Sequence, residues 1–433
     1  MLSAERRVDA LATARDVAAR VTDRQRIGAA IVASRDQTNF PKSIHWEPAG
    51  IAQGDAGLAL MCAYFDRCFP NEGWDVTGHD FLVSAAAHAE RRELGPSLYS
   101  GIAGLGLAAS QLGRDGMRYT RLSSTLDAAL APQAVALAGA LEGQEHGVPV
   151  GQFDAISGLS GIGAYLLMRR GQPHVDAALD RLLEALVDLT RASAEGPPRW
   201  FTPVELMFDE TTAAMYPDGH LNCGLAHGIP GPLAVMALAY TEGVEVRGLR
   251  DAVASIAAWL CDHRIDDAWG INWPTMVALP GDAPPPAEPS RAAWCYGSPG
   301  VARALWLAGT ALENERLTTI AIEAMRAVYG RPLHERQIDS PTFCHGVAGL
   351  LQITLRFAHD TGEQVFTGAV ADLVTQLLSA YEPDALLGFR SIEPGGNAVD
   401  QAGLLDGAPG VALVLLAAAT DAEPTWDRLF LLA

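Results

Sequence analysis

A Gly-x-x-Gly step recurs seven times along this 433-residue chain. The steps are roughly 50 to 70 residues apart, a spacing that suits a repeated pair of helices. After each step the sequence stays apolar for about three helical turns. The steps begin at Gly54, Gly101, Gly158, Gly228, Gly297, Gly346 and Gly407, and the apolar runs are 58–65, 105–112, 162–168, 232–240, 301–307, 350–357 and 411–418.

These runs are apolar on nearly every side, which predicts buried inner helices. Residues 175–193 and 312–328 instead alternate apolar and charged residues at helical spacing, which predicts outer helices with one solvated face. Seven such helix pairs predict an all-α fold, an α/α toroid in a single domain over residues 1–433. An open superhelix is the alternative. Closure is favoured because the inner helices are too apolar to line an exposed concave face.

Charge and composition limit the partners. The formal net charge of −20 argues against nucleic acid or an anionic membrane as the main partner, and it is compatible with a basic peptide. No uninterrupted apolar run reaches the roughly 20 residues that span a bilayer. Residues 1–21 form a mixed-charge amphipathic pattern that differs from a secretory signal. These features predict a cytoplasmic protein without an integral membrane segment.

Two segments interrupt the helical rhythm, at 195–222 and at 266–290. The first is rich in prolines and aromatic residues, and the second contains a run of three prolines at 284–286. Each segment precedes a step that carries candidate ligands. We therefore expect two loop insertions that lie over the same end of the toroid and contact the substrate. Simple connecting loops are the alternative.

Zinc-type ligands come directly before two successive steps. Cys295 precedes the fifth step by two residues, and Cys344 and His345 precede the sixth. Two thiolates and one imidazole are good zinc ligands, and three protein ligands leave a fourth position open, as in catalytic sites. A thiolate-rich zinc is a modest Lewis acid, so it suits holding a substrate thiol as a nucleophilic thiolate better than it suits hydrolysis. A buried cysteine and a capping histidine are the alternative reading.

Acid–base candidates come before two other steps. His227 precedes the fourth step, and Asp154 lies four residues before the third. An Asp–His pair at one end of the toroid can take and give a proton near neutral pH, although a structural histidine is the alternative. Arg291 is a candidate for stabilising a developing enolate or for pairing with Asp154, and Tyr296 is a candidate hydrogen-bond donor.

Four segments together resemble the lanthionine synthetase C-like cyclases. They are Ser157-Gly-Leu-Ser-Gly161, Leu225-Ala-His-Gly228, Arg291-Ala-Ala-Trp-Cys-Tyr-Gly-Ser-Pro-Gly300 and Phe343-Cys-His-Gly-Val-Ala-Gly349. The resemblance runs from about Gly54 to Gly410. It implies an α/α toroid with a central zinc bound by Cys295, Cys344 and His345. It also implies that His227 and Asp154 handle protons, with His227 as the acid that protonates the enolate, and that Arg291 and Tyr296 support the site.

The resemblance further implies a reaction and its partners. A peptide cysteine thiolate adds to a dehydroalanine or dehydrobutyrine of the same dehydrated precursor, which gives a lanthionine or methyllanthionine ring. The length is that of the stand-alone cyclases, which act with a separate dehydratase and a transporter and can associate peripherally with the membrane through that complex. Two rival functions are a non-catalytic peptide-binding scaffold and another zinc–thiolate S-alkylating enzyme, such as a prenyltransferase-like barrel.

Overall fold

The computed structural model describes residues 2–114, 116–144, 146–191, 196–279 and 286–433, and most of them are helical. Contacts between Cα atoms group the chain into two compact units. The first unit comprises Met1–Gly95, Tyr99–Ser124 and Pro332–Trp426, and the second comprises Pro96–Leu98, Thr125–Arg331 and Asp427–Ala433. The predicted single domain over 1–433 stays a prediction.

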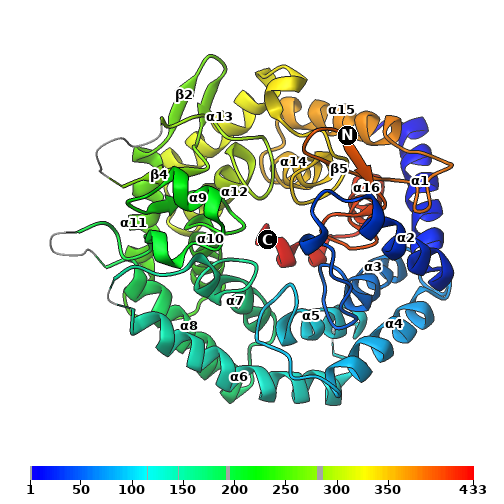
Figure 1. Cartoon of the computed structure of the whole chain (residues 1–433), viewed down its shortest axis with the longest axis horizontal. Helices are drawn as coiled ribbons and strands as arrows, with labels where there is room; N and C mark the ends of the chain where they lie inside the picture. Colours follow the sequence, from blue (N-terminus) through cyan, green and yellow to red (C-terminus); the bar gives the residue numbers. More distant parts are fainter. Residues whose placement is uncertain (1, 115, 145, 192–195, 280–285) are drawn as a thin grey trace. The chain divides into compact units, whose positions relative to one another are not determined.

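Seven buried helices follow the seven glycine steps, as the sequence predicts (Figure 1). Six of them begin at the residue after the first glycine of the step, and α10 begins two residues after Gly228. Nearly every residue of these inner helices is buried. The inner helices are α3 (Asp55–Cys68), α5 (Ile102–Leu112), α7 (Leu159–Met168), α10 (Pro230–Thr241), α12 (Ser298–Ala311), α14 (Val347–Thr361) and α16 (Ala408–Ala419).

The glycines are required by close backbone approach. Gly297 has a φ of +90°, and a Cβ there would lie 1.7 Å from the carbonyl oxygen of Arg291. At Gly300, the second glycine of the same step, a Cβ would lie 2.3 Å from the carbonyl oxygen of Trp294. Only glycine leaves room for the loop to fold back on the first turn of its own helix. The step therefore fixes where the residues just before each inner helix are placed.

The outer helices carry one apolar face. In α8, for example, Leu179, Leu182 and Leu186 are buried, whereas Asp180 and Glu184 of the same helix face outward. The predicted outer helices at 175–193 and 312–328 correspond to α8 and α13, and residues 192 and 193 of the first lie outside the described part. The outer helices are α4 (Trp74–Ala89), α6 (Thr120–Glu142), α8 (Pro173–Leu189), α11 (Leu249–Asp262), α13 (Glu315–Gly330) and α15 (Gln364–Ser379).

In the first unit the inner helices pack in the order α14, α16, α3, α5, each against the next. The N-terminal helix α1 (Ala4–Thr22), followed by α2 (Arg24–Gln37), packs on α16 and on α15. The start of the chain therefore supplies the outer helix for the last inner one, and Figure 1 shows α1 beside α15 and α16. The amphipathic pattern predicted for residues 1–21 is explained by this contact.

In the second unit α10 lies between α7 and α12 and packs on both. Helices α8, α11 and α13 pack on the inner helices that precede them, α7, α10 and α12. This order brings the loops before α7, α10 and α12 next to one another. Those loops carry Asp154, His227 and Cys295, which are three of the predicted site residues.

Short antiparallel pairs of strands cover parts of the loops. β1 (His220–Asn222) pairs with β4 (Met276–Ala278), β2 (Ile265–Asp267) with β3 (Gly270–Asn272), and β5 (Ser391–Glu393) with β6 (Asn397–Val399). The short helices are α9 (Glu210–Met215), η1 (Pro41–Ser43), η2 (Val150–Gln152), η3 (Val204–Leu206), η4 (Leu333–Arg336) and η5 (Thr425–Phe430). Through β1 and β4, the two segments predicted as insertions lie side by side. Residue 195 of the first insertion and residues 280–285 of the second lie outside the described part.

No helix within the described ranges combines the length and the apolar character that a bilayer-spanning segment needs.

Candidate functional site

Backbone hydrogen bonds join three loops of the second unit. The amide of Ala155 donates to the carbonyl of Ala226 at 3.0 Å, and the amide of Ala226 donates to the carbonyl of Cys295 at 3.3 Å. Asp154, His227 and Tyr296 are each the immediate neighbour of one of these residues. The three loops therefore form one continuous strip, and the candidate side chains follow along it.

Asp154 and His227 form a tightly held pair. The Oδ2 of Asp154 lies 2.6 Å from the Nδ1 of His227, while its Oδ1 accepts hydrogen bonds from the amides of Ser157 at 2.7 Å and Gly158 at 2.8 Å. The carboxylate is 1% exposed and sits in the turn that opens α7. Because an ionised carboxylate only accepts, Nδ1 of His227 carries a hydrogen and Nε2 is left for proton exchange. The side chain of His227 is 34% exposed, which gives that nitrogen access to a substrate.

Tyr296 and Arg291 belong to the loop before α12. The Tyr296 hydroxyl accepts a hydrogen bond from Nδ2 of Asn222 at 3.2 Å, so the structure adds Asn222 to the neighbourhood of the site. Arg291 is half-buried in the same loop. Among the described residues, the ion pair of Asp154 is with His227 and not with Arg291. The roles predicted for Arg291 and Tyr296 stay predictions.

Cys295 is held in the same loop by the tryptophan that precedes it. Trp294 is fully buried, its Nε1 donates to the carbonyl of Phe430 at 2.9 Å, and the two rings meet edge to face at 5.2 Å. Cys295 itself is 6% exposed. This anchoring fixes the position of the thiol relative to the start of α12.

The first unit holds a second group of ligand atoms. The Sγ of Cys344, a ring nitrogen of His345 and a carboxylate oxygen of Asp406 lie within 4.8 Å of one another. The amide of Cys344 donates to the carbonyl of Leu405 at 3.1 Å, which joins the loops before α14 and α16. Three ligand atoms this close together could hold one metal ion.

Asp406 is a residue that the sequence reasoning missed. Its Oδ1 lies 3.7 Å from Nδ1 of His345, and burial raises its pKa while His345 opposes that shift. The signal was present, because Asp406 precedes Gly407 directly, as His345 precedes Gly346 and His227 precedes Gly228. The predicted zinc set joins Cys344 and His345 of the first unit with Cys295 of the second, and that combination stays a prediction.

The second unit contains another buried cysteine, Cys223, close to the site residues in the sequence. All six cysteines are free. Burial raises the pKa of Cys223 to about 12, although this residue lies only four positions before His227. A thiol that is so hard to ionise is a poor source of the thiolate that zinc needs. Cys223 therefore serves as a buried reference for Cys295.

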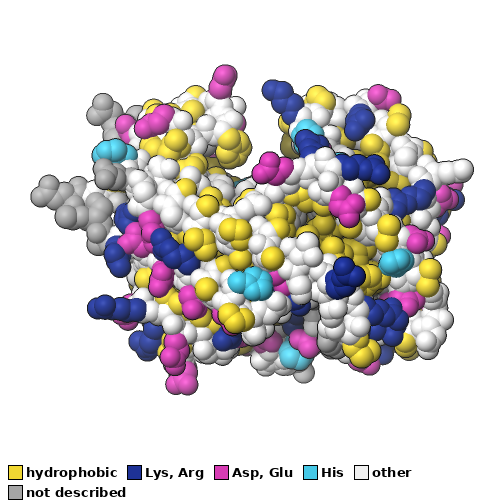
Figure 2. Space-filling view, turned by 90° about the horizontal axis from the view of Figure 1, so that it is seen from below, with side chains coloured by type: hydrophobic (Ala, Val, Ile, Leu, Met, Phe, Trp, Pro, Cys, Tyr) yellow, Lys and Arg dark blue, Asp and Glu magenta, His cyan; other side chains and the backbone are white. Residues whose placement is uncertain are grey.

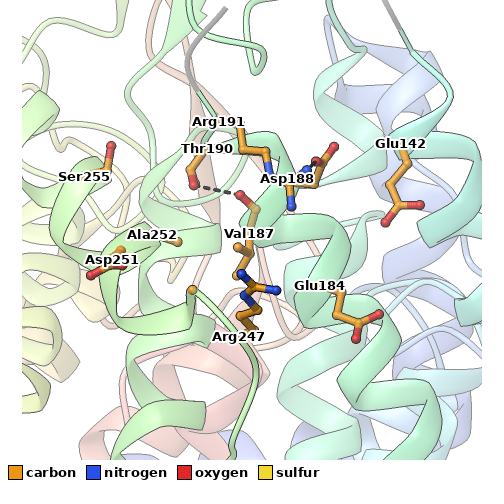
Figure 3. Close-up of a pocket in the computed structure, with 11 residues that line it drawn as sticks. Glu142, Glu184, Val187, Asp188, Thr190, Arg191, Arg247, Asp251, Ala252 and Ser255 are labelled. Atoms are coloured by element: carbon orange, nitrogen blue, oxygen red, sulfur yellow. Dashed lines mark hydrogen bonds and ion pairs between the residues drawn. The ribbon is translucent and has the colours of Figure 1, made fainter.

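A cavity of about 940 Å³ lies in the second unit (Figure 3). It opens between α8 and α11, and none of the predicted site residues lines it. Arg191 pairs with Asp188 at 2.7 Å, and Glu142 and Glu184 pair with Arg181, which does not line the cavity. Its charged lining residues are Glu142, Glu184, Asp188, Arg191, Arg247 and Asp251. Figure 2 shows Lys or Arg side chains and Asp or Glu side chains scattered among hydrophobic ones on one face of the molecule. With four carboxylates and two arginines, the described lining is not a concentrated positive site of the kind that binds a diphosphate.

His220, on strand β1, predicts a pH dependence of stability. It is 3% exposed, and burial lowers its pKa to about 4 from 6.5. Between pH 4 and pH 6.5, His220 binds a proton in the unfolded chain but not in the folded one. The stability that the neutral, buried His220 allows is therefore fully present above pH 6.5 and is lost as the pH falls towards 4. Between pH 7 and pH 5 we expect this histidine to cost about 2 kcal/mol of unfolding free energy.

Urea unfolding of the wild type and of His220→Gln at both pH values measures this difference. The glutamine cannot titrate, so the carboxylates that protonate in both proteins cancel in the comparison. An equal loss of stability in the two proteins would show that His220 is not the group responsible.

Comparisons with known proteins identify the family and the fold. A family model for lanthionine synthetase C-like proteins matches residues 45–431. The nisin biosynthesis protein NisC of Lactococcus lactis subsp. lactis is 27% identical over 301 residues, which cover 68% of this chain and 70% of that protein. A solved structure of a nisin cyclase matches with a TM-score of 0.77 at 23% identity, and it covers 94% of this chain and 97% of that one. This likeness confirms the predicted fold class, the α/α toroid. The chain belongs to the lanthionine synthetase C-like protein family.

Proposed function

We propose that this protein is a lanthipeptide cyclase that closes thioether rings in a dehydrated precursor peptide. The observation that carries the proposal is the Asp154–His227 pair at 2.6 Å, on the strip of loops that also carries Cys295. A buried carboxylate that orients an accessible imidazole is an arrangement for moving a proton. In this family the reaction that needs such a proton is the addition of a thiol to a dehydroamino acid.

The reaction is an addition in which no atom is lost. The substrate cysteine gives its thiol proton to Nε2 of His227, its sulfur bonds to Cβ of dehydroalanine or dehydrobutyrine, and the double-bond electrons move onto Cα and the adjoining carbonyl. His227 then delivers a proton from Nε2 to Cα, and Asp154 stabilises the charged imidazole through Nδ1. Arg291 and Tyr296 are proposed to stabilise the negative charge on the enolate oxygen.

Cys295, Cys344 and His345 are the proposed zinc ligands. When bound, zinc would hold the substrate thiol as a thiolate that is still nucleophilic. The donor set supports this choice of metal, because sulfur and imidazole ligands favour zinc over magnesium or calcium. In this proposal the precursor peptide meets the protein in the cytoplasm. A separate dehydratase and a transporter would form a complex with the protein and bring the protein to the periphery of the membrane.

Ring formation is the direct test. The probe is a synthetic peptide with one cysteine and one dehydroalanine, incubated with the zinc-loaded protein. We expect free thiol to disappear at unchanged peptide mass, faster than in the same peptide with heat-inactivated protein. Such a control is needed because thiols add to dehydroamino acids without a catalyst. A rate equal to this background, for several ring sizes, would favour the non-catalytic peptide scaffold. Turnover of prenyl diphosphates with a thiol peptide would favour the S-alkylating enzyme.

A further inference from the structure

We propose that Asn222 is a positioning residue that sets the orientation of the Tyr296 hydroxyl. The inference rests on the proposed function in one respect, since it takes Tyr296 to donate a hydrogen bond during ring closure. Asn222 is 4% exposed and ends strand β1, five residues before His227. Nothing in the sequence pattern alone singled it out.

The orientation of the Asn222 amide is fixed by the backbone. Its Oδ1 accepts a hydrogen bond from the amide of Gly224 at 2.9 Å. The backbone N–H of Gly224 can only donate. The atom of the Asn222 side chain that faces it must therefore be the oxygen. The other end of the amide group, Nδ2, therefore faces Tyr296, at 3.2 Å from the phenolic oxygen.

This orientation determines the polarity of the contact with Tyr296. Because Nδ2 carries two hydrogens and has no lone pair to offer, the phenolic oxygen must accept. The proton of the Tyr296 hydroxyl is then directed away from Asn222. A phenol that accepts one hydrogen bond also becomes a stronger donor through its own hydrogen. Asn222 thus both orients the hydroxyl of Tyr296 and strengthens it as a donor.

The ring of Tyr296 is held from the same segment. A Cβ on Gly224 would lie 2.4 Å from Cε1 and 2.5 Å from Cδ1 of Tyr296, so the ring lies directly on the glycine backbone. Strand pairing of Asn222 with Met276 in β4 holds the segment in place. One short stretch, Asn222 to Gly224, therefore fixes the ring plane and the hydroxyl together. That arrangement is more than a chance contact of two polar groups.

Replacing Asn222 by aspartate reverses the polarity of this hydrogen bond. In Asn222→Asp one carboxylate oxygen still accepts from Gly224, and the other now accepts the proton of Tyr296. We expect kcat for ring closure to fall about tenfold, the effect of one misdirected hydrogen bond, with KM changed less than twofold. In a Tyr296→Phe background the same substitution should change kcat less than twofold. An equal loss in both backgrounds would overturn the proposal, because Asn222 would then act without Tyr296.

A spectroscopic readout tests the hydrogen bond without relying on cyclase activity. The Raman doublet of tyrosine reports whether a phenol mainly accepts or donates, and subtracting the spectrum of Tyr296→Phe isolates this one residue. We expect an acceptor signature in the wild type and a donor signature in Asn222→Asp. If the aspartate variant does not fold, Asn222→Ala should weaken the acceptor signature instead. If Tyr296 shows a donor signature in the wild type, the inference is overturned even if the protein forms rings. If Tyr296 shows an acceptor signature but the protein forms no rings, the result counts only against the proposed function.

Discussion

Purified Cys295→Ala protein should retain little zinc, whereas the wild type should carry about one zinc per chain. A three-ligand site that loses a thiolate keeps only Cys344 and His345, and two protein ligands bind zinc weakly. Ring closure should fall to the uncatalysed rate in the same variant, because the substrate thiol is then no longer held as a thiolate. Elemental analysis of both proteins, purified in parallel without chelator, measures the zinc content.

Cys223→Ala is the matched control for this prediction. Cys223 is also buried, in a neighbouring loop of the same unit, but its raised pKa of about 12 disfavours a thiolate. We expect this variant to keep its zinc. Equal zinc in Cys295→Ala and the wild type would remove Cys295 from the ligand set and would leave Cys344, His345 and Asp406 as the group to test next. Loss of zinc from Cys223→Ala alone would contradict the ligand assignment altogether.

The repeat was readable from the sequence because the first glycine meets a local steric requirement in six of the seven steps, those at Gly54, Gly158, Gly228, Gly297, Gly346 and Gly407. At Gly297 both the positive φ and the contact with the carbonyl of Arg291 exclude any side chain. A requirement of this kind leaves a residue-level mark at each of these copies, so the helix starts could be predicted closely. Asp154 and His227 could be paired for the same reason. Asp154 lies four residues before the third step and His227 one residue before the fourth. The inner helices that begin at these steps, α7 and α10, pack against each other.

Features that depend on distant packing could not be read in this way. Helix α1 packs on α16, which lies near the opposite end of the sequence. The amphipathic pattern of α1 predicts that one face of the helix is buried, but it does not predict which helix that face contacts. The role of Asn222 depends on which of its amide atoms faces the Gly224 amide, which is decided by backbone geometry and not by residue type. The pairing of β1 with β4 joins two segments that are too irregular for periodicity to reveal a strand.

Asp154→Asn should lower kcat for ring closure by about 10² to 10⁴ while leaving zinc bound. The two backbone amides of Ser157 and Gly158 would still require an acceptor, so the oxygen of the new amide would stay with them. Its Nδ2 would then face Nδ1 of His227, where it can only donate. The imidazole would have to carry its hydrogen on Nε2 instead, and the doubly protonated form would lose its acceptor. Single-turnover ring closure, followed by loss of free thiol, measures the effect.

The comparison with His227→Ala decides whether the two residues work as a unit. Asp154 is proposed to act only by orienting His227 and stabilising its protonated form. The double variant Asp154→Asn/His227→Ala should then be no slower than His227→Ala alone, because the effects of residues that act together do not add. Additive losses would instead give Asp154 an independent role at the substrate. Loss of zinc from Asp154→Asn would mean that the carboxylate supports the metal site. A double variant that matches His227→Ala in rate and the wild type in zinc content fits only a proton-transfer pair that is separate from the metal.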